Sequence, residues 1–323
     1  MTYRHLALAA VSALALGLGA SSAFAANSST VVQDGNYNNA TVTQKDGSSG
    51  TSSITQSGVN ASGAPGVATV TQAGAATNGS TINQLATSLR ASATVDQSGT
   101  LGATDTSDIT QDGEDAIASV TQANTTGAGV NLVTIDQSGN DGTELQNALV
   151  SQTGGADTVS ITQSQTLSLA GADASVTQVG SNDSVTIVQS GDESYALVSQ
   201  TGSGSSASVT QTGARNTATS VRTGNGDNFI VTQTSNDNIS TITGAGWGDT
   251  ITVLQDLVDG NSSTIDQGGN GNTVSLTQNA ANASTSEIDQ AGAIDVATVT
   301  QSVVGGYSSI TQDGSYNTAT IKQ

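Results

Sequence analysis

Glutamine recurs along the chain at the end of one short motif, in which valine or isoleucine stands two residues before it. The motif divides the sequence into 25 short segments, which we call arms, and 23 of them end in glutamine. A glutamine amide both donates and accepts hydrogen bonds, so identical amides stacked above one another can bond in a continuous ladder. These residues therefore indicate repeated stacking of like segments rather than catalysis.

The ends of successive arms lie 10 to 16 residues apart, most often 11 or 12, which suits one short strand and one turn. Two arms near the middle end at Thr223 and Gly244 instead of glutamine. We predict that one set of polar residues stacks in register inside the fold. Its members are Gln33, Gln44, Gln56, Gln72, Gln111, Gln122, Gln152, Gln163, Gln178, Gln189, Gln200, Gln211, Gln267, Gln278, Gln301, Gln312, Gln323, Asn38 and Asn317.

The composition offers little from which to build a catalytic or metal site. Cysteine is absent, the single histidine is His5, and 6 basic side chains stand against 26 acidic ones, for a net charge of −20. A catalytic site needs acids and bases that converge in a cleft, and disulfides or thiolate metal sites need cysteine. We therefore predict that the protein is not an enzyme and uses no cofactor. So acidic a chain is not expected to bind nucleic acid or anionic lipid.

Within an arm the residues alternate as they do in a β-strand. In residues 40–44, alanine, valine and glutamine share one face and two threonines share the other, whereas glycine and asparagine fill the connections. Four residues before the end of an arm, the first fourteen arms carry alanine in every even arm and serine or valine in every odd one. From Ser240 onward serine again marks every second arm. Two arms therefore form one coil.

An array of such coils predicts an all-β fold, a flattened parallel β-solenoid with two sheets, 25 strand arms and about twelve two-arm coils. Each strand is expected to lie ~4.8 Å from its equivalent in the next coil. An inward glutamine without partners would cost about 1 to 3 kcal/mol, but a ladder of glutamines satisfies its members. A slip of one residue would bury threonine and expose valine, so the pattern also fixes the register.

Residues 1–25 have the three parts of a secretory signal peptide. Arg4 and His5 charge the start, residues 6–20 are apolar, and Ala23-Phe24-Ala25 forms a small-x-small cleavage site. The apolar run is short for a membrane span and no basic cluster follows it, so we predict export without membrane insertion. Residues 26–323 are then a single repeat domain, with 5 basic and 26 acidic side chains and a formal charge of −21.

The first and last arms, residues 33–44 and 312–323, resemble the curlin repeat Gln-x-Gly-x2-Asn-x-Ala-x3-Gln at every defined position. Other arms, such as 111–122 and 290–301, match it with one or two changes. The resemblance implies a secreted, extracellular subunit of curli-like functional amyloid, the cell-surface fibre of bacterial biofilm matrices, with a role in adhesion. It implies that the chain's partners are other copies of itself, a nucleator subunit and an outer-membrane secretion channel. It also implies that the glutamine, asparagine and alanine of the motif face inward.

Neither end of the array carries a recognisable cap. A solenoid exposes an unpaired sheet edge at each end, and natural monomers usually blunt such edges with charge, proline or a covering segment. We predict that the terminal arms, with Val31, Val42, Ile310 and Ile321, stack head-to-tail on another copy and form an open filament. Near the two arms that lack glutamine, possible gatekeepers that slow this stacking are Arg222, Thr223, Asp227 and Gly244.

The same pattern of arms is compatible with two other functions, a monomeric adhesin and an ice-binding protein. A secreted adhesin or surface repeat protein that stays monomeric would differ by having true end caps. An ice-binding solenoid would show an unbroken outward row of threonines, but both outward positions are threonine only in the arms that end at Gln44, Gln72, Gly244 and Gln301.

Overall fold

The structure, a computed structural model, describes most of the repeat region. The described residues are 27–45, 49–58, 65–74, 77–85, 90–100, 102–126, 129–139, 145–165, 171–257, 259–279 and 283–323. The predicted signal peptide, residues 1–25, lies outside them.

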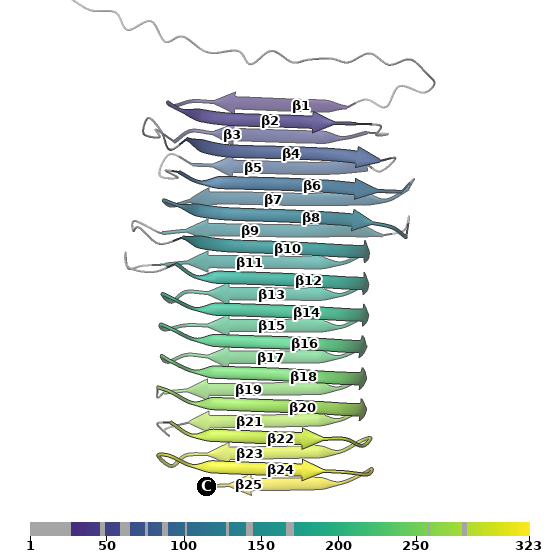
Figure 1. The fold of residues 1–323 in the computed structure, drawn as a ribbon, viewed down its shortest axis with the longest axis vertical. Helices are drawn as coiled ribbons and strands as arrows, with labels where there is room; N and C mark the ends of the chain where they lie inside the picture. Colours follow the sequence, from purple (N-terminus) through teal and green to yellow (C-terminus); the bar gives the residue numbers. More distant parts are fainter. Residues whose placement is uncertain are drawn as a thin grey trace, which may run out of the picture.

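The described residues form 25 β-strands and no helix, arranged in two sheets that face each other (Figure 1). The thirteen-stranded sheet contains β1 (Ser28–Gln33), β3 (Thr51–Gln56), β5 (Thr77–Gln84), β7 (Thr104–Asp112), β9 (Val130–Ser138), β11 (Thr158–Ser164), β13 (Ser184–Gln189), β15 (Ser206–Gln211), β17 (Asn228–Gln233), β19 (Thr250–Asp256), β21 (Thr273–Asn279), β23 (Val296–Gln301) and β25 (Thr318–Lys322). The twelve-stranded sheet contains β2 (Asn38–Gln44), β4 (Gly66–Gly74), β6 (Ser92–Gly99), β8 (Ala116–Asn124), β10 (Gln146–Gly155), β12 (Asp173–Ser181), β14 (Tyr195–Ser203), β16 (Thr217–Asn225), β18 (Ile239–Trp247), β20 (Ser262–Asn270), β22 (Thr285–Gln290) and β24 (Tyr307–Gln312).

Successive strands alternate between the two sheets, so one strand from each sheet makes a coil. Within a sheet the strands are parallel and glutamine pairs with glutamine: Gln163 of β11 stands opposite Gln137 of β9 and Gln189 of β13. The fold predicted from the sequence, a flattened two-sheet parallel solenoid with 25 strands, is confirmed. Because each strand pairs with the strand one coil away, the backbone hydrogen bonds between strands run along the long axis of the molecule.

A narrow hydrophobic core runs between the sheets along the whole stack. Away from the two ends of the stack, the valine or isoleucine two residues before the final residue of an arm is generally buried, as at Ile54, Val120 and Ile187. The residue two positions earlier is often small and also buried, as at Ala118 and Ala174, which lets the sheets approach closely. With so few apolar atoms in each coil, and about 0.8 kcal/mol for each buried methylene, a coil depends on its neighbours for stability.

The turns that follow the twelve-stranded sheet use glycine where successive coils touch. Gly202 has a φ of +142°, and a Cβ added there would lie 1.6 Å from the carbonyl oxygen of Gly224 in the next coil. Gly180 stands in the same relation to Gly202, at 1.5 Å. Only a residue without a side chain permits both this backbone conformation and this spacing of the coils.

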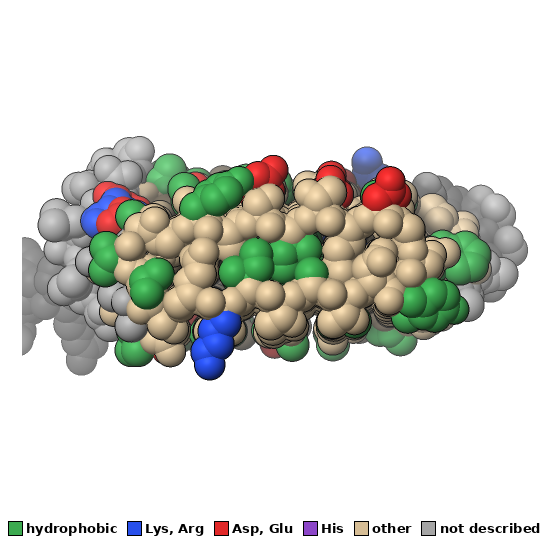
Figure 2. All heavy atoms as spheres, turned by 90° about the horizontal axis from the view of Figure 1, so that it is seen from below, with side chains coloured by type: hydrophobic (Ala, Val, Ile, Leu, Met, Phe, Trp, Pro, Cys, Tyr) green, Lys and Arg blue, Asp and Glu red, His purple; other side chains and the backbone are tan. Residues whose placement is uncertain are grey.

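Neither end of the stack is covered by another described part of the chain (Figure 1). Seen from the C-terminal end, hydrophobic side chains reach the end face in the middle of an elongated section, with polar atoms on both sides (Figure 2). Ala319 and Ile321 of β25 pack against the core but are only partly buried. At the other end every residue of β1 is exposed, including Val31 at 46%.

Candidate functional site

The glutamines of the thirteen-stranded sheet form one uninterrupted hydrogen-bonded ladder. In every step Nε2 of one glutamine donates to Oε1 of the glutamine one coil further along the chain, at 2.7 to 3.3 Å. The side chains between the two ends of the ladder are buried. The members are Gln33, Gln56, Gln84, Gln111, Gln137, Gln163, Gln189, Gln211, Gln233, Gln255, Gln278, Gln301 and Gln323.

The same amides also join the two sheets. Gln189 donates from Nε2 to the backbone oxygens of Asp173 and Ser194, both at 3.1 Å, at the start of strands in the opposite sheet. Gln163 makes the equivalent bonds to Asn147 and Ala172, at 3.0 and 2.8 Å. A buried amide left unpaired would cost about 1 to 3 kcal/mol, so these partners are what permit glutamine at an interior position.

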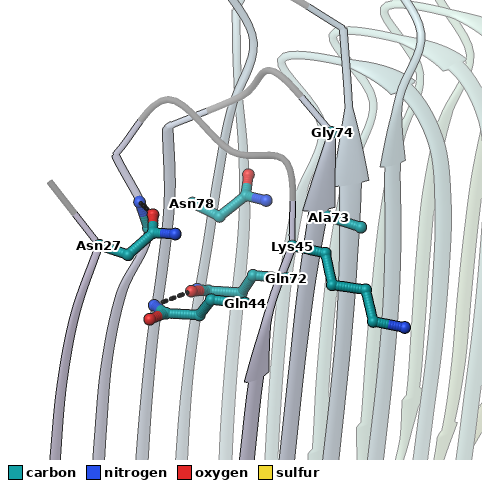
Figure 3. A pocket seen from close by; sticks show the side chains of 8 residues that line it. Asn27, Gln44, Lys45, Gln72, Ala73, Gly74 and Asn78 are labelled. Atoms are coloured by element: carbon teal, nitrogen blue, oxygen red, sulfur yellow. Dashed lines mark hydrogen bonds between the residues drawn. The ribbon is translucent and has the colours of Figure 1, made fainter. Parts of the chain in front are cut away.

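The twelve-stranded sheet carries a second ladder, which is interrupted once. Its first rung, the bond from Gln44 Nε2 to Gln72 Oε1, is drawn in Figure 3. Bonds of 2.8 to 3.2 Å then continue along the row to Gln200. After the interruption the row resumes with two bonds of 2.8 Å. The members are Gln44, Gln72, Gln97, Gln122, Gln152, Gln178 and Gln200, and then Gln267, Gln290 and Gln312.

The interruption corrects one sequence expectation, that an arm ends at Thr223. The structure places Arg222, not Thr223, opposite Gln200 and in the ladder row. Val221, taken from the sequence as the buried residue of this arm, is 41% exposed, and Ser220 stands in the buried row instead. The motif Val221-x-Thr223 imitates the repeat, but pairing with the neighbouring strands fixes the register one residue earlier.

Arg222 is buried at the interruption, with 1% of its surface exposed. Its Nη2 lies 3.1 Å from Asp249 Oδ2 and 3.6 Å from Asp227 Oδ2, and its Cζ lies 4.3 Å from the centre of the Phe229 ring. Burial lowers the pKa of the Arg222 side chain, and the two carboxylates partly offset this effect. The guanidinium occupies the space beside Gly244, the next residue in the ladder row, which has no side chain. A Cβ at Gly244 would lie only 1.7 Å from Arg222 Nη1.

The residues predicted as gatekeepers thus separate into two groups. Arg222, Asp227 and Gly244 meet in one buried cluster, whereas Thr223 lies outside it on the exposed face of β16. The cluster breaks the second ladder in the middle of the stack, so Gln200 and Gln267 do not meet. Whether this break slows assembly stays a prediction.

A further row of buried polar side chains lines the turns that lead into the thirteen-stranded sheet. From Asn131 onward, the backbone N–H of each member donates to the side-chain oxygen of the member one coil earlier, at 2.7 to 3.4 Å. Sequence reasoning included only Asn317 of this row, although aspartate at the asparagine position of the repeat, as at Asp295, was the available signal for other members. The linked members are Asn131, Asp157, Asp183, Ser205, Asp227, Asp249, Asn272, Asp295 and Asn317.

The row places carboxyl groups where water does not reach them. Burial raises the pKa of Asp157 to about 6, and it raises the pKa of Asp105, which stands opposite Asn131 in β7, to about 6 as well. Burial also raises the pKa values of Asp183 and Asp249. Deprotonating these groups at neutral pH therefore costs stability, because burial penalises the charged form.

The terminal residues singled out from the sequence lie at or near the two open ends. Val42 and Ile321 pack against the core but are only partly buried, whereas Ile310 of β24 is 4% exposed. Asn38 donates from Nδ2 to the backbone oxygen of Gly58 at 3.2 Å. Asn317 donates from its backbone N–H to Asp295 Oδ1 at 2.7 Å. The motif asparagines therefore bond to the neighbouring coil at both ends of the chain.

The described part of the chain offers no clustered chemistry of another kind. No three histidine, cysteine, aspartate or glutamate side chains are grouped there so that they could hold a metal ion. A small pocket near the N-terminal end is lined by ladder and turn residues, among them Asn27, Gln44 and Asn78 (Figure 3). None of the described segments forms a helix of the length and apolar character needed to cross a membrane.

The sequence was compared with known families and proteins. The family described as the curlin associated repeat matches residues 25–58 and 171–202. The first segment contains β1, β2 and β3, and the second contains β12 and most of β14 with the strand between them. None of the curated proteins matches the sequence.

Proposed function

Because the chain carries curlin associated repeats, a type found in structural amyloid subunits and not in enzymes, we propose that it is a secreted subunit that stacks on copies of itself into curli-like extracellular fibres. Such fibres belong to the biofilm matrix and serve surface adhesion. Residues 1–25 act in this proposal as the export signal, and residues 26–323 as the single fibre-forming domain.

The observation that carries the proposal is the open state of both ends. The core and both glutamine ladders continue to the last described coils, and none of the described residues covers them there. A strand edge of this kind pairs with another chain unless charge, proline or a cap prevents it. A second copy presents the same rows of side chains at the same spacing, so it is the occupant that best continues them.

Charge opposes this stacking. With a formal charge near −21 on the exported chain, acidic side chains of successive subunits come close together along a fibre. Salt at ~0.15 M reduces the screening length to about 8 Å, and acidification toward the isoelectric point near 4.1 removes charge directly. We expect both conditions to shorten the lag before fibres appear.

Two further partners belong to the same proposal. A nucleator subunit would present a first open edge, and an outer-membrane secretion channel would deliver the unfolded chain to the cell surface. Both follow from the resemblance to curlin proteins alone.

The direct test uses purified residues 26–323, observed by negative-stain microscopy and by thioflavin fluorescence over time. We expect unbranched fibres whose diffraction shows a ~4.8 Å repeat along the fibre axis. A chain that stays monomeric for days at high concentration would contradict the proposal and favour the monomeric adhesin.

A matched pair of variants tests whether the ends control growth. Val31→Lys, Val42→Lys, Ile310→Lys and Ile321→Lys together place charge in the core of the terminal coils and should slow elongation. The control carries lysine at the same number of outward positions in the same four strands, Thr30, Thr41, Thr311 and Thr320. Equal elongation rates for the two variants would argue against stacking through the ends.

A further inference from the structure

The described residues form an odd number of strands, 25, and this determines how a second copy can be placed on the solenoid. β1 begins the thirteen-stranded sheet and β25 ends it, so both terminal strands lie in the same sheet (Figure 1). The twelve-stranded sheet begins with β2 and ends with β24. If the chain forms fibres as proposed above, the next copy must meet an end at which one sheet extends half a coil beyond the other.

A copy added by simple translation leaves a gap. β1 of the new copy would pair with β25, and β2 of the new copy would then lie above β24 in the other sheet. One strand position between β24 and that β2 would be empty, because adjacent strands are ~4.8 Å apart and these two would be ~9.6 Å apart. Both strands would keep unpaired backbone groups inside the fibre, which is costly.

A copy that is first turned by half a turn about the long axis leaves no gap. Its β1 pairs with β24 and its β2 pairs with β25, so that the two sheets exchange roles from one copy to the next. The strands of the two sheets run in opposite directions (Figure 1), and the half-turn reverses β1, which makes it parallel to β24. Every strand position is then filled by a parallel neighbour.

The small buried side chains support the half-turn independently. At the start of the chain, serine occupies this row in the thirteen-stranded sheet, as at Ser29, Ser52 and Ser80, and alanine occupies it in the other sheet. At the end of the chain serine and alanine have exchanged sheets. Serine now lies in the twelve-stranded sheet, at Ser263, Ser286 and Ser308, and alanine in the thirteen-stranded sheet, at Ala297 and Ala319.

The half-turn places the serine row of one copy on the serine row of the next, and alanine on alanine. Ser308 of β24 then lies next to Ser29 of the following copy. On its other side, within the same copy, the hydroxyl of Ser308 donates a hydrogen bond of 3.0 Å to Ser286. Ala319 of β25 meets Ala40 of the next copy. Simple translation would instead place Ala319 against Ser29 and leave Ser308 without a neighbour.

The half-turn also places the two most similar segments of the chain on each other. Residues 312–323 would lie directly over residues 33–44 of the next copy, turn on turn and strand on strand. Tyr37 and Tyr316 occupy equivalent positions in the two turns, and both have a left-handed backbone, with φ values of 58° and 64°. Both tyrosine side chains are exposed and would stack on the outside of the junction.

Hydrogen-bond polarity fits the same junction. All glutamine bonds of both ladders run from Nε2 toward Oε1 of the next coil, so the C-terminal end presents amide donors and the N-terminal end presents acceptors. In the half-turned stack Gln312 donates to Gln33 and Gln323 donates to Gln44. Both ladders therefore continue across the junction, each passing from one sheet of the first copy to the other sheet of the second.

We propose that successive copies in the fibre are related by a half-turn about the long axis, with β1 and β2 of one copy on β24 and β25 of the copy before it. This proposal rests on the proposed fibre function and specifies its interface. Because each of the 25 strands advances the stack by half of ~4.8 Å, one subunit spans about 60 Å. A junction without a missing strand then recurs along the whole fibre.

Cysteine pairs distinguish the two arrangements, since the chain contains no cysteine of its own. In the half-turned stack, outward residue 322 lies over residue 43 of the next copy, and residue 311 lies over residue 32. In the translated stack, residue 322 lies over residue 32. The variants are Thr43→Cys with Lys322→Cys, Val32→Cys with Thr311→Cys, and, for the alternative, Val32→Cys with Lys322→Cys.

Fibres of each variant are treated with a short thiol-to-thiol cross-linker and separated on a denaturing gel. We expect a series of covalent multimers from the first two variants and only monomer from the third. Multimers from the third variant alone would overturn the half-turn and leave the fibre function intact. The absence of fibres from the unmodified chain would instead contradict the proposed function itself.

Electron cryomicroscopy of unmodified fibres gives a second measurement. The half-turn predicts that a subunit advance of about 60 Å is accompanied by a rotation of half a turn, added to any gradual twist of the coils. Subunits related by the gradual twist alone would overturn the proposal.

Discussion

Replacing two buried aspartates by asparagine should stabilise the middle coils at neutral pH and remove part of their pH dependence. Asp105 and Asp157 are fully buried, and they lie one coil before and one coil after Asn131, where the row of polar turn residues begins. Burial raises the pKa of each carboxyl from an ordinary value of 3.8 to about 6. The folded state therefore binds these protons more tightly than the unfolded state, so stability is greatest below pH ~4 and falls as the pH rises to ~6.

The size of the effect follows from the same values. One unit of pKa corresponds to about 1.4 kcal/mol, so a shift of about two units corresponds to at most about 3 kcal/mol lost per group at pH 7. Asparagine has nearly the same shape and carries no charge, and at position 157 it keeps an acceptor oxygen for the backbone N–H of Asp183. Asp105→Asn with Asp157→Asn should recover much of this loss.

Amide hydrogen exchange of β7, β9 and β11 measures the effect where it occurs, after correction for the intrinsic exchange rate at each pH. In the unmodified chain, protection of these strands should fall between pH 5 and pH 7.5, and in the double variant it should change much less. The control, Asp96→Asn with Asp266→Asn, removes the same charge from exposed positions and should behave like the unmodified chain. Equal flattening in the control would show that net charge, and not burial, is responsible, which would refute the reasoning.

Three further changes test the buried cluster and the turns, each by hydrogen exchange or thermal unfolding of the full chain. Arg222→Gln leaves two buried carboxylates without their cation and should cost about 3 to 5 kcal/mol around β16 to β19, whereas Arg215→Gln, which breaks an exposed ion pair, should leave the stability of its coils nearly unchanged. Gly244→Gln should destabilise the same coils, because its side chain meets the guanidinium of Arg222, and unchanged protection there would contradict the packing described. Gly202→Ala should lower the melting temperature clearly more than Gly204→Ala, since both have positive φ but nothing lies within 4 Å of a Cβ at Gly204.

Most of the architecture was predictable from the sequence because each arm contains the complete residue pattern of one strand and one turn. The alternation of buried and outward residues defines a strand, the glutamine marks its end, and glycine or asparagine marks the turn, as in residues 33–44. Identical arms then favour pairing with their equivalents, since only equal positions bring valine onto valine and glutamine onto glutamine. Local pattern and long-range pairing agree in almost every coil.

The arm that ends at Arg222 shows where local pattern fails. Val221 and Thr223 match the short motif at the wrong position, although Gly213, Asn216 and Ala218 have the repeat spacing that ends at Arg222. The register is decided by β14 and β18, which pair with β16 over its whole length. An arginine in the ladder row becomes acceptable only because Asp227 of the following turn, Asp249 of the turn one coil further on and the empty position at Gly244 meet there.

By itself the sequence determined the strands, their alternation between two faces and their stacking in coils. These depend on a period of two residues within each arm and on the recurrence of equivalent arms every 22 to 30 residues. Only the tertiary structure decided which charged groups are buried, since Arg222 meets Asp227 of the turn after β16 and Asp249 of the turn after β18. Burial is a property of the whole stack, in which contacts also form between residues one coil apart in the chain, and a single arm cannot specify it.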